Sequence, residues 1–130
     1  MSKNKILKEW IDTALIEYKA AKHLLEGSEF FLDIAAYHCQ RSIEKSLKAF
    51  LFANDIQPPK THDLGFICSM CIEMKKEFKH YLQDCEKIAV YAIKPRYPSK
   101  FGVVKQDVDF ALKKALEIHQ CVAKLARIDE

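Results

Sequence analysis

Apolar residues recur at alternating steps of three and four positions along most of this sequence, as they do on helices that bury one face. The pattern predicts four long helices over residues 5–25, 28–53, 77–93 and 103–128. Ser28 is a suitable N-cap for the second helix, because its hydroxyl can accept a hydrogen bond from a free backbone N–H. Four helices with one apolar face each indicate an all-α protein.

A shorter helix is predicted between the second and the fourth. Pro58 and Pro59 interrupt the helical pattern, since proline lacks the N–H donor and disfavours helix in the preceding residue. Thr61 or His62 is expected to cap a helix that begins near Asp63. The side chains expected to face inward are Leu64, Ile67, Cys71 and Met74. Because short connections make neighbouring helices antiparallel, we expect an antiparallel up-and-down bundle of four long helices plus a shorter one.

The composition agrees with a single globular domain over residues 1–130, which is long enough to bury one core. The net charge of +3 is too small and too evenly mixed to indicate nucleic-acid binding by bulk electrostatics. No apolar run approaches the roughly 18 residues of a membrane span, and no signal-peptide core follows the basic N-terminus. We therefore expect a cytoplasmic protein without a membrane partner.

The five cysteines form an odd set in a chain without a secretion signal, which favours reduced thiols. Cys39, Cys85 and Cys121 fall on apolar stripes, where cysteine acts as a small hydrophobe. Cys68 and Cys71 have the spacing of a redox or zinc motif, but neither a second cysteine pair nor a histidine pair completes a four-ligand site. Structural cysteines and no metal centre are expected.

The second helix carries the main candidate site. Gln40, Glu44 and Lys48 recur every four residues and form one polar stripe. The stripe borders an apolar seam of Ala36, Cys39, Ile43, Leu47 and Phe50. With Tyr37 and Arg41 on the same side, it would make a solvated face, rich in donors, that could receive a phosphate or a base. The alternative is ordinary surface chemistry, because an exposed Glu–Lys pair stabilises a helix by roughly 0.2–0.5 kcal/mol.

A second candidate segment holds Arg96 and Tyr97 between two prolines, which stiffen the backbone. A guanidinium on a rigid loop suits bidentate phosphate recognition, and Tyr97 could stack on a base. His62 could also hydrogen-bond a phosphate. The alternatives are an Arg96–Glu44 ion pair at the bundle margin, packing of Tyr97 against the last helix, and the capping role of His62.

Four spaced motifs carry a family resemblance. They are Trp10 in the first helix, A-x4-Q-x3-E-K-x2-K-A over 35–49, T-H-D-L over 61–64 and Y-x4-R-Y-P over 91–98. In this order, and over nearly the whole chain, they resemble the HEPN domain family, named for presumed nucleotide binding. The resemblance implies a helical bundle, usually a homodimer. Many members look like partners of small nucleotidyltransferases in toxin–antitoxin pairs, and others are metal-independent ribonucleases.

The ribonuclease members carry an arginine followed four to six residues later by a histidine, near the start of the last helix. No histidine follows Arg96 at that distance, and the next one is His119. RNA cleavage without a metal needs a group that transfers protons. The resemblance therefore implies a non-catalytic member more than an enzyme.

These observations predict a nucleotide-binding module that acts as a homodimer, with a small nucleotidyltransferase partner, or both. The expected phosphate site combines the Arg96 loop with the polar stripe. Its residues are Arg96, Tyr97, Gln40, Arg41, Glu44, Lys48 and His62. No resident cofactor is expected, and a nucleotide such as ATP, or an RNA, is the candidate ligand. The alternatives are a divergent metal-independent RNA endonuclease toxin and a structural helical adaptor.

Overall fold

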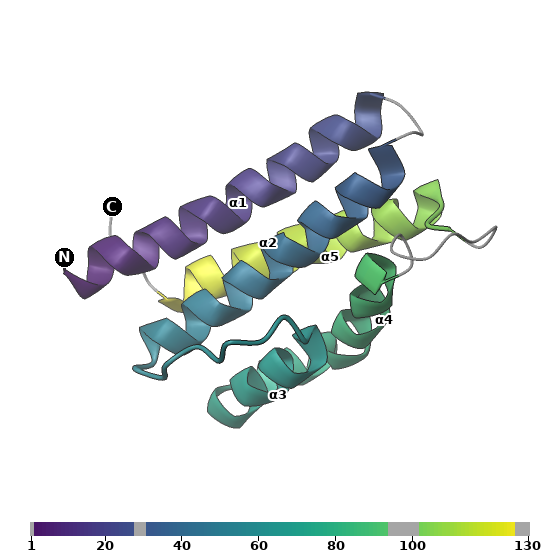
Figure 1. The fold of residues 1–130 in the computed structure, drawn as a ribbon. Helices are drawn as coiled ribbons and strands as arrows, with labels where there is room; N and C mark the ends of the chain where they lie inside the picture. Colours follow the sequence, from purple (N-terminus) through teal and green to yellow (C-terminus); the bar gives the residue numbers. More distant parts are fainter. Residues whose placement is uncertain (1, 28–30, 94–101, 127–130) are drawn as a thin grey trace.

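A computed structural model describes residues 2–27, 31–93 and 102–126. Its elements are α1 (Lys3–Gly27), α2 (Leu32–Ala53), α3 (Leu64–Met74), the 3₁₀ helix η2 (Lys76–Tyr81), α4 (Leu82–Ile93) and α5 (Lys105–Ala126). No strand occurs within the described ranges, so the predicted all-α bundle is confirmed. α1 runs antiparallel to α2 and to α5 (Figure 1).

α2 is the central element, because it packs against α1, α3, α4 and α5. The predicted seam of α2 is buried along its whole length, with Ala36, Cys39, Ile43 and Leu47 fully inaccessible and Phe50 nearly so. The facing stripes of α1 and α5 are buried too. Their fully or almost fully buried members are Leu7, Ile11, Ala14, Ala21, Val108, Ala111, Ala115, Ile118 and Val122. A polar group on α2 therefore lies close to the core.

The start of α2 differs from the prediction. The helix begins at Leu32, after Phe31, whose side chain makes no capping hydrogen bond. Ser28, the predicted cap, lies outside the described residues.

The cap of α3 also differs, and the prediction of Thr61 or His62 is wrong. The Asp63 carboxylate accepts a hydrogen bond from the Phe66 N–H at 3.2 Å, whereas the Thr61 hydroxyl accepts one from the Asp63 N–H at 3.1 Å. Aspartate is the better cap here because its negative charge faces the positive end of the helix.

Two further expectations fail at helix ends. Residues 77–93 are divided between η2 and α4 instead of forming one helix. Met74, expected to face inward from the shorter helix, and Val104, which falls on the apolar stripe of the predicted helix over residues 103–128, are each about half exposed. Met74 is the last residue of α3, and Val104 precedes α5, so helical periodicity does not place either side chain on a packed face.

Cys39, Cys68, Cys71 and Cys85 are buried in the core. Burial raises the pKa of the Cys39 thiol to about 12, so it stays protonated and behaves as a small apolar side chain. In the described part of the chain, no three histidine, cysteine or acidic residues are placed to hold a metal ion. None of the described helices has an apolar stretch long enough to span a bilayer.

Candidate functional site

The predicted polar stripe of α2 is far less solvated than expected. Gln40 and Lys48 are 9% and 7% exposed, and the Glu44 side chain is 13% exposed. The interpretation of Gln40 and Lys48 as part of a solvated face is therefore wrong. The connector between α2 and α3 runs back beside α2 and brings His62 onto the stripe (Figure 1).

Glu44 is the centre of the first polar cluster. Its carboxylate oxygens lie 2.9 and 3.1 Å from His62 Nδ1, and Lys48 Nζ contacts Oε2 at 3.1 Å. A carboxylate can only accept here, so Nδ1 carries the proton and Nε2 is the nitrogen that remains for another partner. The His62 side chain is 82% exposed, so a largely shielded carboxylate holds an accessible imidazole.

Gln40 contacts the backbone of the connector between α2 and α3. Its Nε2 donates to the His62 carbonyl oxygen at 3.4 Å. Its Oε1 is buried and has no hydrogen-bond partner among the described residues. Gln40 and Glu44 thus contact His62 directly, and Lys48 contacts the Glu44 carboxylate.

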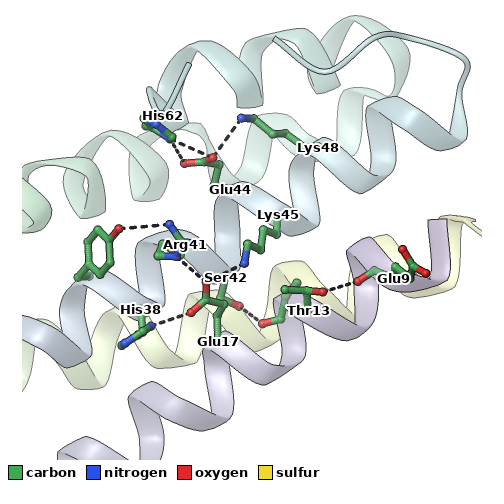
Figure 2. Close-up of polar contacts among 12 residues, drawn as sticks. Glu9, Thr13, Glu17, His38, Arg41, Ser42, Glu44, Lys45, Lys48 and His62 are labelled. Carbon is green, nitrogen blue, oxygen red and sulfur yellow. Dashed lines mark hydrogen bonds and ion pairs between the residues drawn. The ribbon is translucent and has the colours of Figure 1, made fainter. Parts of the chain in front are cut away.

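A second cluster surrounds Glu17 of α1, which the sequence analysis did not single out. Its carboxylate lies 2.7 Å from His38 Nδ1, 2.5 Å from Arg41 Nε and 2.8 Å from Lys45 Nζ. Glu17 itself is only 7% exposed. Arg41 therefore belongs to this cluster and not to the Glu44 group. Figure 2 shows Arg41 and Lys45 between the two carboxylates, on one side of α2.

The Glu17 carboxylate stays ionised despite its burial. Burial by itself raises the pKa of this group, but hydrogen bonds from Lys45, Arg41 and His38 outweigh it and lower the pKa to about 2. The hydrogen bond to Glu17 also raises the pKa of Arg41. Both groups are therefore charged at neutral pH.

A sequence signal for this cluster exists in retrospect. Ala14, Glu17 and Ala21 follow helical spacing, which places a carboxylate on the buried stripe of α1. His38, Arg41 and Lys45 share one face of α2 by the same spacing. A carboxylate on an apolar stripe needs a partner of opposite charge, because an unpaired buried charge is strongly unfavourable.

Arg41 also contacts an aromatic side chain. Its Nη1 donates to the Tyr37 hydroxyl at 3.2 Å, and its guanidinium carbon lies 5.5 Å from the centre of the Tyr37 ring. Both residues remain accessible, with 44% of Tyr37 and 37% of the Arg41 side chain exposed. An arginine held by a carboxylate at Nε keeps other N–H donors for an anion.

Arg96 and Tyr97 lie outside the described residues, so their expected place beside the polar stripe stays a prediction. Tyr91, the first residue of the same motif, is buried at the end of α4. Burial raises the pKa of its hydroxyl, and the Asp107 carboxylate raises it further. The Asp107 side chain near the start of α5 therefore lies close to the Tyr91 hydroxyl near the end of α4.

The two clusters leave a positive surplus on one side of α2. Two carboxylates face the guanidinium of Arg41 and the amino groups of Lys45 and Lys48, together with two histidines. Arg41 and His62 are the most accessible basic groups of the two clusters. Such an arrangement can donate hydrogen bonds to an anion without rearranging its supporting side chains.

Comparison with protein families matches the chain to one family. The family model described as the HEPN domain matches residues 7–125, a range that runs from α1 into the last turn of α5. A comparison with curated protein sequences found no match.

Proposed function

This protein belongs to the HEPN domain family, and we propose that it is a non-catalytic nucleotide-binding module whose ligand phosphates contact the accessible side of α2. The family match supports a nucleotide-binding or ribonuclease-type module in general. In the proposed site, Arg41 donates to the phosphates, and His62 donates through Nε2 when its imidazole carries both protons. Glu17 and Glu44 hold these two side chains in place, and Arg96 approaches from its loop.

The observation that carries this proposal is a pair of largely shielded carboxylates, each of which holds one accessible basic side chain. Glu17 and Glu44 are largely shielded from water, while Arg41 and His62, one basic partner of each, reach the surface. Side chains that are already ordered lose less entropy when they bind a ligand. The same contacts also fasten α1 and the connector to α2, which is the purely structural reading of both clusters.

Calorimetric titration of ATP distinguishes a phosphate-binding role of the two clusters from a purely structural one. We expect saturable heat with the wild type and at least about tenfold weaker binding for Arg41→Ala, because a charge-assisted hydrogen bond is lost. Arg96→Ala should weaken binding as well. Lys79→Ala is the matched control, since it removes an exposed positive charge from η2 and should leave the affinity unchanged.

A short single-stranded RNA serves as the comparison ligand in the same experiment. No heat with either ATP or RNA would contradict the proposal and favour a structural helical adaptor. Arg41→Ala must keep the wild-type circular dichroism spectrum for its result to count, because Arg41 also contacts Glu17.

The proposed module acts as a homodimer, with a small nucleotidyltransferase in a toxin–antitoxin-type pair, or both. Support comes from the sequence motifs that resemble such members of the family. A nucleotidyltransferase gene beside this one, whose product co-purifies with the protein on co-expression, is the expected result. Failure of the two purified proteins to associate would remove the nucleotidyltransferase partner from the proposal.

One observation favours the ribonuclease alternative. The Glu44–His62 contact leaves Nε2 of an exposed imidazole open for proton transfer, although the usual arginine–histidine motif is missing. Metal-independent cleavage of a short RNA that His62→Gln abolishes would support an enzyme. Lack of cleavage by the pure wild-type protein would exclude this alternative for that RNA.

A further inference from the structure

A groove opens beside the Glu17 cluster, where α1 faces α2. It has a volume of about 260 Å³ and is lined by Ile6, Glu9, Trp10, Thr13 and Lys45. Pockets that enclose a whole drug-sized ligand usually measure roughly 300–1,000 Å³. This groove is therefore suited to one ring system with part of its substituents.

The walls of the groove combine an aromatic surface with polar groups. Trp10 is partly buried and packs against the core, which limits the movement of its indole ring. The Thr13 hydroxyl donates to the Glu9 carbonyl oxygen at 2.6 Å, so its own oxygen can still accept. The Glu9 side chain is exposed and offers a carboxylate acceptor at the rim.

Lys45 joins this groove to the proposed phosphate site. Its Nζ contacts Glu17 Oε2 at 2.8 Å, and the same oxygen accepts from Arg41. Figure 2 shows Lys45 above Glu17, with Thr13 and Glu9 following along α1. A phosphate bound at Arg41 would therefore leave the rest of a nucleotide beside the groove.

We propose that the groove holds the base of the bound nucleotide, stacked on Trp10, and that it prefers bases with an exocyclic amino group. Aromatic side chains stack on any base, so Trp10 supplies affinity without selectivity. A carboxylate such as that of Glu9 accepts hydrogen bonds, and the exocyclic amino groups of adenine, cytosine and guanine can donate to it, whereas the exocyclic groups of uracil are carbonyls that only accept. The negative charge of Glu9 also disfavours a phosphate in the groove.

This inference rests on the proposed function, because the phosphate anchors come from the α2 site. The base preference is a separate property, and Trp10 allows it to be measured directly. The sequence contains a single tryptophan, so the fluorescence emission of the protein at tryptophan wavelengths reports on this groove alone.

The test titrates ATP, CTP, UTP and inorganic triphosphate while tryptophan emission is recorded. ATP and CTP should change the emission saturably, inorganic triphosphate should leave it unchanged, and UTP should bind about tenfold more weakly than ATP. Glu9→Ala should abolish the preference of ATP over UTP. Glu26→Ala, which removes another exposed carboxylate of α1, is the matched control and should keep the preference.

Calorimetry on the same samples distinguishes failure of the proposed base site from failure of nucleotide binding as a whole. ATP binding with heat but without any change in Trp10 emission would overturn the base site and leave the proposed function standing. Equal affinities for ATP and UTP would overturn the predicted base preference. Absence of both heat and emission change would contradict the proposed function and this inference together.

Discussion

Glu17 shows how one side chain can connect stability to a site. It lies on the buried stripe of α1 and bonds three basic residues of α2, His38, Arg41 and Lys45. Removal of one partner from a buried ionic group is costly, because the remaining charges lose their compensation. The carboxylate therefore stabilises the α1–α2 contact and at the same time orients Arg41.

Glu17→Gln should destabilise the protein at pH 7 by about 3 kcal/mol, and the difference should shrink in acid. The folded-state pKa of about 2 is below the ordinary 4.5, so the carboxylate contributes its full stability above about pH 4.5. This contribution is lost as the pH falls from 4.5 towards 2. Urea unfolding of both proteins between pH 7 and pH 3 measures the effect.

The matched control for this experiment is Glu26→Gln. Glu26 is exposed near the end of α1, and surface substitutions of this kind usually change stability by less than about 0.5 kcal/mol. A constant difference between Glu17→Gln and wild type across the pH range would show that the carboxylate charge is not what stabilises the fold.

At the scale of elements, the connector between α2 and α3 decides where His62 lies. Gln40 and Glu44 hold this residue from the α2 side, and Asp63 caps α3 directly after it. His62 is therefore fixed between two helices although its ring is exposed. Within residues 61–64, Asp63 thus caps α3 and His62 belongs to the candidate site.

Asp63→Ala should lower the free energy of unfolding by about 1 kcal/mol, because the Phe66 N–H loses its acceptor. Asp63→Asn should retain most of the stability, since asparagine is an equally good cap. Thermal or urea unfolding measures both changes. If Asp63→Ala also reduces ATP affinity while Asp63→Asn does not, the cap positions His62 for binding.

For the whole molecule, the small net charge hides an uneven distribution. The carboxylates of Glu17 on α1 and Glu44 on α2 contact a larger number of basic groups, so a positive region exists in a protein of net charge +3. Large apolar side chains are also exposed on several helices. They include Ile16, Phe31, Ile34, Phe66, Met74, Val90 and Val104.

We expect sedimentation equilibrium to give twice the mass of the 130-residue chain, as the family resemblance implies for a homodimer. Association would remove part of the exposed apolar surface from water, which is favourable in proportion to the area buried. A single species of monomer mass at tens of micromolar protein would contradict this expectation.

Much of the fold follows from the sequence because helical periodicity is a local property. The seam from Ala36 to Phe50 and most of the apolar stripes of α1 and α5 could be predicted from spacing alone and are buried, whereas Val104 is exposed. The helix ends were harder to predict, since Thr61 and Asp63 are both residue types that cap helices and only the chain path selects Asp63.

The candidate site depended on contacts between residues far apart in the chain. Spacing placed Glu44 and Lys48 together, but it could not show that His62 returns to Glu44 or that Glu17 takes Arg41 out of the predicted stripe. The physical reason is that periodicity determines which face of a helix a residue occupies, whereas packing determines which helix lies opposite that face. Local order was thus encoded in the residue pattern, and the pairing of charges was decided by the tertiary structure.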